Sequence, residues 1–238
     1  GKPPKEKTEI ICERNKKATN SIVLMHQTNN LQEKNKLEKS SIRIKKEYID
    51  DLKQLFNFMG VSYIHPNCEA ETYAAHLCKQ NKVHAVYSED MDTLAFGSPL
   101  LIRTCIDRSI KRKDAISIFN LNQILSDFNM DYPQFVDMCI LCGCDYCPTI
   151  PKIGNIRAFQ YIQQYKSIES LLESHKSPVN DDFIQKYKKA RKLFLDYSFD
   201  EESNIHKSLY NKEALSNYLI HNCCMSHNRV QNALKKIK

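Results

Sequence analysis

Between residues 61 and 147 the sequence alternates between short stretches typical of strands and longer stretches typical of helices. β-Branched and aromatic residues predict strands at 61–64 and 83–87, and apolar periodicity predicts a helix over 69–80 between them. Strands separated by helices usually pair in parallel, and ligands bind at the carboxyl ends of such strands. The sequence therefore predicts an α/β fold with a mostly parallel central sheet flanked by helices.

Helices and turns are predicted for most of the remaining chain. A charged helix over 5–17 is followed by an Asn- and Lys-rich segment, 18–40, which we expect to be mobile and partly helical. An amphipathic helix then ends at Gly60. The later predicted elements are a hairpin of strands at 99–106 and 115–119 with a basic connector at 108–113, helices at 121–128 and 133–142, and helices after Pro148 with breaks near Gly154, Pro178 and Ser198.

Basic residues outnumber acidic residues at both ends of the chain but not in its middle. Residues 1–60 contain 13 Lys and Arg against 8 Asp and Glu, residues 61–150 contain 7 against 11, and residues 151–238 contain 15 against 9. Basic surfaces beside an acidic centre suit a polyanion that is processed at the carboxylates. Charge totals alone also fit an ordinary solvated surface, so this interpretation needs further residues to support it.

The cysteines and the apolar content predict a soluble intracellular protein with no membrane partner. Several of the ten cysteines are adjacent or crowded, which suits a reducing compartment better than a disulfide framework. The sequence has no run of about eighteen apolar residues, and its N-terminus lacks the pattern of a signal peptide. Because Gly1 opens inside what reads as an ordered motif, we expect the chain to be part of a longer protein.

Five acidic residues fall where predicted helices or strands meet loops. Glu69 and Glu71 begin a helix, Asp90 and Asp92 follow a buried strand, and Asp145 follows another helix. Carboxylates gathered in one place repel one another unless cations neutralise them. All-oxygen ligation suits Mg²⁺ or Mn²⁺, and two such ions about 4 Å apart activate a water and stabilise the leaving oxygen of a phosphodiester. These residues are therefore predicted to form a metal site.

Ordinary structural roles explain each acidic pair singly. A glutamate at a helix N-terminus interacts favourably with the helix dipole, by roughly 0.3 to 1 kcal/mol, and aspartate is common in turns. Glu69 and Glu71 fit the first role, and Asp90 and Asp92 fit the second. The metal site is favoured because both pairs and Asp145 occur together within one α/β segment.

A zinc-binding module is the alternative from another class of protein. Cys139 lies on the apolar face of a predicted helix, where a free cysteine is a good small core residue. This position argues against a role for Cys139 in zinc binding. The residues with zinc-like spacing are Cys139, Cys142, Cys144 and Cys147 in one cluster, and His221, Cys223, Cys224 and His227 in another.

Four ordered motifs resemble flap endonucleases of the XPG family. The opening Gly1-Lys-Pro-Pro4 is also similar to the family's Asp-Gly-Lys-Pro-Pro, entered one residue late. The resemblance runs nearly from end to end, and it identifies the chain as a member of this family that is expected to lack its N-terminal part. The four motifs are Cys68-Glu-Ala-Glu71, the segment from Ser88 to Pro99, the segment from Gln134 to Cys147, and Ile153-Gly154 with Arg157-Ala158.

The resemblance implies a PIN-like 5′ nuclease fold and a reaction, which is the cutting of 5′ DNA flaps near their junction with duplex in replication and repair. Lys7 and Arg14 match two catalytic basic residues that steady the scissile phosphate, where a positive charge offsets the charge that develops as water attacks. A solvated helix face is the ordinary alternative for this pair. Two Mg²⁺ ions, which Mn²⁺ can replace, are implied at Glu69, Glu71, Asp90, Asp92 and Asp145.

The resemblance also implies two functional regions. Residues 1–147 correspond to a nuclease core in which 15–58 form a helical arch, or gateway, for the 5′ strand. Residues 148–238 correspond to a helix-two-turn-helix and a C-terminal helical DNA-binding region. The helix-two-turn-helix grips duplex backbone through amides and a monovalent cation, here K⁺. Its predicted DNA-binding residues are Lys152, Ile153, Gly154 and Arg157.

The chain departs from the family pattern at several places. Two metal-site aspartates of the family lie upstream of Gly1, so we expect the site to be incomplete within these residues. Lys152 stands where the family usually has glycine, and Cys144 where it usually has serine. No aromatic-ended sliding-clamp motif follows the last basic helix, so clamp binding is expected only of a longer parent.

The sequence leaves several functional details open. A 5′ to 3′ exonuclease or a junction-cutting nuclease is the alternative within the family, and an inactive DNA-binding module is the alternative outside it. The expected partner is branched DNA with a 5′ flap, bound by a monomer. The expected location is the nucleus, or a cytoplasmic replication site if the protein is viral.

Overall fold

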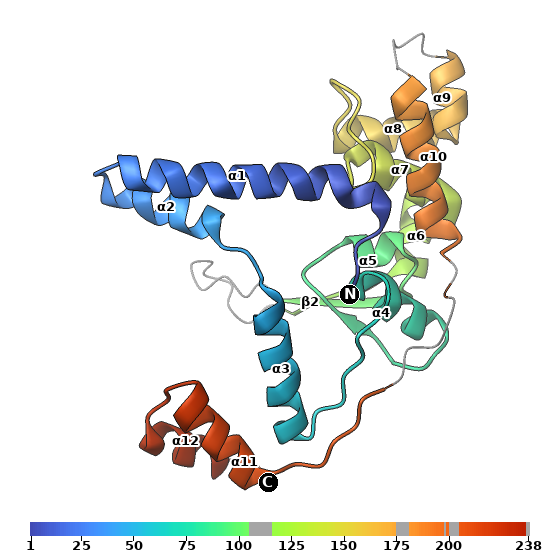
Figure 1. The fold of residues 1–238 in the computed structure, drawn as a ribbon. Coiled ribbons are helices and arrows are strands. Elements are labelled where there is room, and N and C mark those ends of the chain that lie inside the picture. The colour runs from blue at the N-terminus through green and yellow to red at the C-terminus, as the bar shows by residue number, and fades with distance from the viewer. Residues whose placement is uncertain (105–115, 175–180, 198, 200–204, 237–238) are drawn as a thin grey trace. The chain divides into compact units, whose positions relative to one another are not determined.

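The computed structural model describes residues 1–104, 116–174, 181–197, 199 and 205–236. The chain divides into two compact units, each formed by two stretches of sequence (Figure 1). The first unit contains residues 1–11 and 66–200, and the second contains residues 12–65 and 201–238. None of the helices in the described ranges is both long enough and apolar enough to cross a membrane. The predicted functional regions, 1–147 and 148–238, stay a prediction, since the compact units group the chain differently.

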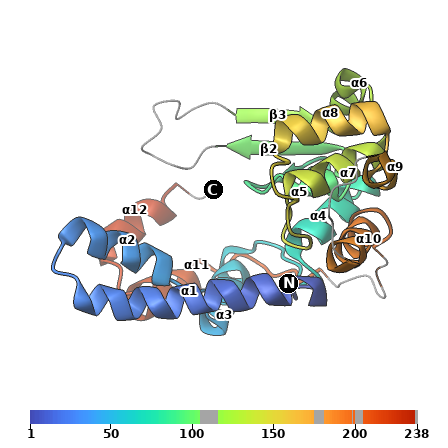
Figure 2. The same ribbon diagram turned by 90° about the horizontal axis from the view of Figure 1, so that it is seen from above.

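A three-stranded sheet in the order β1, β2, β3 lies in the first unit, and Figure 2 shows β2 beside β3. β1 (Val86–Tyr87) pairs in parallel with β2 (Leu100–Thr104), which pairs antiparallel with β3 (Ile116–Asn120). Leu101 lies between Val86 and Phe119 in the register and is completely buried. In the described part of the chain the sheet is therefore mixed, where the sequence predicted a mostly parallel one.

The strand predictions differ in their outcome. The hairpin of β2 and β3 is confirmed, and its basic connector at 108–113 lies outside the described residues. The strand expected at 61–64 is wrong, because Tyr63 forms an isolated antiparallel bridge with His206 instead. β1 is shorter than the predicted 83–87, since the chain turns at Asn81, which has a φ of 57°, and still bends through residue 84.

Helices make up most of the first unit. Asn129 ends α6 in a left-handed conformation, and a capping box between Asp131 and Gln134 begins α7. The helices predicted at 69–80, 121–128 and 133–142 are confirmed. The helical elements are the 3-10 turn η1 (Lys5–Lys7), α4 (Ala70–Lys79), α5 (Asp92–Ala95), α6 (Leu121–Phe128), α7 (Tyr132–Cys142), α8 (Asn155–Tyr165), α9 (Ile168–Ser174) and α10 (Asp181–Leu195).

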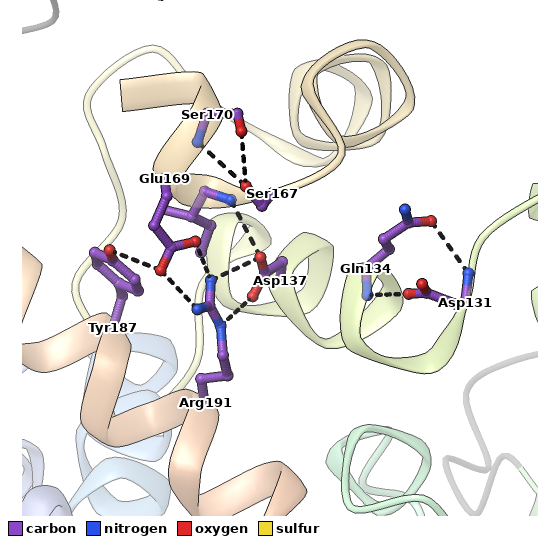
Figure 3. Close-up of polar contacts among 9 residues, drawn as sticks. Asp131, Gln134, Asp137, Ser167, Glu169, Ser170, Tyr187 and Arg191 are labelled. Atoms are coloured by element: carbon purple, nitrogen blue, oxygen red, sulfur yellow. Dashed lines mark hydrogen bonds and ion pairs between the residues drawn. The ribbon is translucent and has the colours of Figure 1, made fainter. Parts of the chain in front are cut away.

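α7 is the central helix of the first unit. It packs against α5, α8 and α10. Arg191 on α10 lies between Asp137 on α7 and Glu169 on α9, and this network ties the three helices together (Figure 3). Because α7 ends shortly before Asp145, its packing positions that carboxylate. The buried residues of α7 are Phe135, Val136, Asp137, Met138, Ile140 and Leu141.

The second unit is helical and has a small core of its own. Leu215, Val230 and Leu234 form this core, and Leu55 and Phe58 pack against it. The predicted amphipathic helix ending at Gly60 is confirmed, and Gly60 closes it at a φ of 67°. The helical elements are α1 (Thr8–Gln27), whose first four residues belong to the first unit, α2 (Leu31–Ser41), α3 (Lys46–Met59), α11 (Lys212–Asn217), the π-helical turn η2 (Tyr218–Asn222) and α12 (His227–Leu234).

Segment 18–40 is more helical than the sequence predicted. α1 continues to Gln27, and the chain leaves helical conformation only at 28–30 before α2 begins. Asn30 explains the new start, since its side chain accepts hydrogen bonds from the backbone N of Gln32 and Glu33. The hydroxyl of Ser40 donates to that of Ser21 at 2.8 Å, which joins α2 to α1. The mobility expected of this segment stays a prediction.

The region after Pro148 is helical with interruptions, as the sequence predicted. Gly154 marks one break, where it is the N-cap residue of α8. The break expected near Pro178 lies outside the described residues, whereas the one near Ser198 is confirmed, because α10 ends at Leu195 and residues 196–197 are not helical. Residues 205–211 were expected to be helical, but they lie outside any helix, and His206 is held there by its bridge to Tyr63.

Candidate active site

Lys7 joins two of the predicted metal ligands. Its Nζ lies 2.5 Å from Oε1 of Glu69 and 3.0 Å from Oδ2 of Asp145. Burial alone would lower the pKa of Lys7, but hydrogen bonds and charge from the two carboxylates outweigh burial and raise the pKa above its ordinary value. Lys7 is therefore a fixed positive charge between two carboxylates.

Three separate chain segments bring these groups together. Lys7 ends η1, Glu69 is the N-cap residue of α4, and Asp145 lies in the turn that follows α7. Gly143 opens that turn at a φ of 109°, and a Cβ at this position would lie 2.7 Å from Cγ2 of Thr149. Because glycine tolerates both the conformation and the close approach, Gly143 sets the path by which the chain leaves α7 and reaches Asp145.

The acidic turn after β1 adds two more carboxylates. Oδ1 of Asp90 accepts a hydrogen bond from the backbone N of Asp92 at 2.9 Å. Burial, followed by the charges of Asp90 and Asp145, raises the pKa of Asp92 to about 6. Glu69 raises this pKa as well, whereas Lys7 lowers it. Asp92 therefore lies within electrostatic reach of the whole cluster.

Glu69 and Asp145 contact Lys7, Asp92 lies within reach of their charges, and Asp90 accepts a hydrogen bond from the backbone N of Asp92. Glu71 is half-buried in the first turn of α4, two residues after Glu69. Arg14 is exposed on α1 in the second unit, where its backbone carbonyl accepts a hydrogen bond from Arg43. The metal-binding role of Glu71 and the catalytic role of Arg14 stay predictions.

Tyr146 contacts the cluster, and the sequence analysis missed it. Its hydroxyl donates a hydrogen bond to Oε2 of Glu69, and its ring centroid lies 5.8 Å from Nζ of Lys7. The residue is 4% exposed. Its place directly after Asp145 was the available signal, since an aromatic residue with a polar tip beside a ligand is suited to hydrogen-bond a neighbouring ligand.

The four predicted DNA-binding residues lie together at the turn before α8. The backbone N of Ile153 donates to the carbonyl of Ile150 at 3.0 Å, which closes a β-turn with Lys152 in its third position. Lys152 has a φ of 70°, a conformation that favours glycine at this turn position. Gly154 caps α8, and Nη1 of Arg157 donates to the carbonyl of Lys152 at 2.8 Å. Their contact with DNA stays a prediction.

The acidic cluster fits a divalent cation in its charge and in its ligand chemistry. Its donors are carboxylate oxygens, and the ammonium of Lys7 already stands among them as a positive charge. Burial is the main cause of the raised pKa of Asp92, and the charges of Asp90 and Asp145 raise it further, a repulsion that a cation would relieve. Among the residues that the structure describes, however, no three Asp, Glu, His or Cys side chains form a ready ligand set. Cation binding would therefore draw these side chains closer together.

The closely spaced cysteines do not favour the zinc alternative. Cys144 and Cys147 lie opposite each other as an isolated antiparallel bridge. Burial raises the pKa of Cys144 to about 11 and that of Cys147 to about 12, so both thiols stay protonated at neutral pH. Cys139 packs against the core, as the apolar face of its helix predicted.

Comparison with known proteins matches residues 60–145 to the XPG I-region. The chain is 42% identical over 202 residues to Flap endonuclease 1 of Brugia malayi, which covers 82% of this chain and 53% of that protein. It is 36% identical over 247 residues to Flap endonuclease 1 of Glycine max, which covers 100% of this chain and 64% of that protein. The chain belongs to the XPG family. It spans between half and two thirds of the length of these relatives.

Solved nuclease structures show the XPG-family fold at lower sequence identity. Flap endonuclease-1 from Methanococcus jannaschii matches with a TM-score of 0.68 at 23% identity, over 81% of this chain and 57% of that one. The catalytic core of Rad2 in complex with DNA substrate matches with a TM-score of 0.67 at 16% identity, over 81% of this chain and 70% of that one. These matches confirm the predicted α/β 5′ nuclease fold.

Proposed function

We propose that this XPG-family chain is part of a metal-dependent, structure-specific 5′ flap endonuclease that acts in DNA replication and repair. The placement of Lys7 between Glu69 and Asp145, within reach of the half-buried Asp92, is the observation that carries the proposal. Relatives named flap endonucleases, at 36% to 42% identity, support the same activity. The proposed substrate is branched DNA with a 5′ flap, cut near the junction of single strand and duplex.

The acidic cluster is the proposed metal site. Glu69, Asp90, Asp92 and Asp145 would hold Mg²⁺, or Mn²⁺ in its place, and Glu71 is a further candidate ligand. When bound, such ions supply an activated water and stabilise the leaving oxygen of a phosphodiester. The chain supplies carboxylates from α4, from the turn after β1 and from the turn after α7, so each element contributes part of the site.

Lys7 and Arg14 are the proposed contacts to the scissile phosphate. Once a cation neutralises Glu69 and Asp145, the ammonium of Lys7 is available to a phosphate oxygen. A guanidinium such as that of Arg14 binds phosphate through two parallel hydrogen bonds, which fixes its orientation as well as its charge. Preorganised positive charge of this kind stabilises the charge that develops during attack by water.

The distribution of charge supports a second DNA contact. The first unit contains 19 Lys and Arg against 19 Asp and Glu, and the second contains 16 against 9, so the net charge of +7 lies in the second unit. This unit includes residues 15–58, the proposed arch for the 5′ strand. Contacts of lysine and arginine to phosphate predict a binding affinity that falls steeply with salt concentration.

The turn before α8 is the proposed contact to duplex backbone. Lys152, Gly154 and Arg157 are exposed there, and backbone amides at the start of a helix bind phosphate well. We also propose that this turn binds K⁺. The protein is proposed to act as a monomer, in the nucleus or, if it is viral, at a cytoplasmic replication site. For the whole protein, we propose a sliding clamp as a further partner.

Cleavage of a labelled 5′ flap by the protein in its full natural length tests this proposal. We expect the wild type to cut the flap in Mg²⁺. We expect Asp92→Ala to lose cutting but to bind DNA about as well as the wild type. Asp127→Ala is the matched control, because Asp127 is exposed on α6 outside the cluster and hydrogen-bonds Gln123. Undiminished cutting by Asp92→Ala would overturn the metal assignment.

Side-by-side substrates separate the proposal from its alternatives. Faster cleavage of a flap than of a gapped, nicked or four-way substrate supports the endonuclease assignment. Preferred release of mononucleotides from a nicked end would favour the 5′ to 3′ exonuclease, and preferred cutting of the four-way substrate would favour the junction-cutting nuclease. DNA binding by the wild type without any cutting would favour the inactive DNA-binding module.

A further inference from the structure

The two carboxylate oxygens of Glu69 have different partners. Oε1 lies 2.5 Å from Nζ of Lys7, and Oε2 accepts a hydrogen bond from the hydroxyl of Tyr146. The first partner is a flexible cation that also pairs with Asp145, whereas the second is a neutral donor on a rigid ring. One oxygen of Glu69 thus faces positive charge, and the other is occupied by the protein itself.

The ring of Tyr146 is held firmly in place. Its centroid lies 5.4 Å from that of Phe194 on α10 and 6.3 Å from that of Phe96 at the end of α5, in edge-to-face arrangements that aromatic pairs favour. The residue is also only 4% exposed. The packing therefore keeps the hydroxyl aimed at Glu69, to which it donates its hydrogen bond.

We propose that Tyr146 is a positioning residue, which occupies Oε2 of Glu69 so that the carboxylate offers Oε1 alone to a divalent cation. The proposal rests on the proposed function, since it assigns a metal to Glu69. Tyr146 acts through Glu69 and is not itself a ligand. Nothing in the role requires Tyr146 to contact DNA.

The physical consequence follows from the freedom of a glutamate side chain. Without the phenol hydroxyl, the carboxylate of Glu69 can rotate, and both oxygens become available to water or to Lys7. Ordering the carboxylate then costs conformational entropy each time a cation binds. Loss of a group that orients a metal ligand typically lowers metal affinity or activity by about 10- to 100-fold.

Replacement of Tyr146 by phenylalanine removes the hydroxyl and keeps the ring that packs on Phe96 and Phe194. Tyr187→Phe is the matched control, because the hydroxyl of Tyr187 also donates to a glutamate, Glu169, at 3.1 Å, but outside the cluster. Both variants would be made in the protein at its full natural length. Mn²⁺ titration followed by electron paramagnetic resonance gives metal affinity, and flap cleavage at saturating metal gives kcat and KM.

We expect Tyr146→Phe to weaken Mn²⁺ binding by about 10-fold. We also expect kcat to fall at unchanged KM for the flap, and Tyr187→Phe to match the wild type in both measurements. A double-mutant cycle separates positioning from general damage to the fold, because Tyr146→Phe should change Mn²⁺ affinity less than about 2-fold in a Glu69→Ala background.

Three results would overturn the assignment. Mn²⁺ affinity equal to that of the wild type in Tyr146→Phe would show that the hydroxyl does not shape the ligand. If Tyr146→Phe lowered Mn²⁺ affinity equally in the wild-type and Glu69→Ala backgrounds, Tyr146 would act by a route that does not involve Glu69. If the wild type cut no flap and bound no Mn²⁺, the proposed function would fail and this inference with it. The first two results contradict only the role of Tyr146, because the wild type stays active in them.

Discussion

Arg191 on α10 donates hydrogen bonds from Nε and Nη2 to the two carboxylate oxygens of Asp137 on α7, at 2.6 and 2.7 Å (Figure 3). Asp137 is 4% exposed, and it also accepts a hydrogen bond from the backbone N of Ile168 at the start of α9. The same guanidinium donates to both oxygens of Glu169. A single arginine therefore neutralises a buried aspartate and fastens three helices together.

Substitution of Arg191 by methionine should lower the free energy of unfolding by about 3 to 5 kcal/mol, because a buried carboxylate would lose its partner. Urea denaturation measures this change. Lys186→Met on the same helix is the control, since Lys186 pairs with the exposed carboxylates of Glu9 and Asp182, and such pairs contribute about 1 kcal/mol or less.

A compensating variant tests the cause of that loss. Combining Arg191→Met with Asp137→Leu removes the uncompensated charge, and we expect it to recover most of the lost stability. If the double variant were as unstable as Arg191→Met, the loss would come from packing of the arginine side chain and not from the stranded carboxylate.

Glu169 gives the network a defined dependence on pH. Hydrogen bonds from Arg191 lower the pKa of Glu169 to about 2, below its ordinary value of 4.5. A carboxyl whose pKa is depressed in the folded state stabilises the protein above its ordinary pKa, and that contribution disappears as the pH falls through the folded value. The stabilisation by Glu169 is therefore lost between about pH 4.5 and pH 2.

The comparison of wild type with Glu169→Gln isolates this contribution. The side chain is 39% exposed, so solvent screening limits the expected difference in unfolding free energy to about 1 kcal/mol above pH 5. Burial raises the pKa of Asp137, so this residue makes stability depend on pH in the opposite direction. Because Asp137 is present in both proteins, its contribution largely cancels in the difference between them. Chemical denaturation from pH 6 down to pH 2 should show the difference shrinking, and a constant difference would contradict this account.

Local signals were enough to place some site residues from the sequence, and long-range contacts hid others. Glu69 and Asp145 fall at a helix start and after a glycine, which are positions that capping and turn rules identify. Tyr146 and Arg191 depend on partners 77 and 54 residues away, and nothing in the periodicity of their own elements indicates those partners. The partners of both residues could therefore be found only in the folded chain, although the place of Tyr146 directly after Asp145 was a local signal for the residue itself.

The two largest errors in the predicted elements have the same origin. The apolar residues at 61–64 suggested a strand of the sheet, whereas Tyr63 pairs with His206 from the far end of the sequence. The polar composition of 18–40 suggested only partial helix, whereas α1 and α2 cover all of it except 28–30 and contact each other through Ser21 and Ser40. Tertiary contacts outweighed local propensity in both segments.

Lys152→Gly should stabilise the protein by about 0.5 to 1 kcal/mol. A left-handed conformation costs a residue with a Cβ about 1 to 2 kcal/mol, which glycine avoids. Glycine also loses more conformational entropy on folding, and this loss offsets part of the gain in stability. The hydrogen bond from Arg157 goes to the backbone carbonyl of residue 152 and is retained. Thermal denaturation measures the change.

Lys189→Gly is the matched control for this substitution. Lys189 lies exposed in the middle of α10, where glycine costs roughly 1 kcal/mol relative to good helix formers, so the same chemical change should destabilise the protein. Equal destabilisation by both variants would show that the backbone of Lys152 is not strained. Asparagine also tolerates this conformation, so Lys152→Asn should recover part of the gain, and no gain in that variant would contradict relief of backbone strain as the cause.

Removal of Lys7 should make the stability of the protein depend more strongly on divalent ions. In EDTA, Lys7→Met leaves Glu69 and Asp145 without their shared partner, and we expect the free energy of unfolding to fall by about 1 to 3 kcal/mol. A ligand that binds the folded state raises stability according to its affinity. Because the ammonium no longer competes for the carboxylates, added Mg²⁺ should raise the melting temperature of Lys7→Met more than that of the wild type.

Lys5→Met provides the control for the Mg²⁺ experiment. Lys5 is exposed in the same 3-10 turn, so its loss should leave the Mg²⁺-dependent shift in melting temperature unchanged. An equal shift in the wild type and Lys7→Met would mean that the ions bind away from Glu69 and Asp145. Asp145→Asn can then be added to Lys7→Met. If the larger shift in melting temperature disappears in this double variant, the ion binds at the carboxylates that Lys7 pairs with in the wild type, because the ion then needs Asp145 as a ligand.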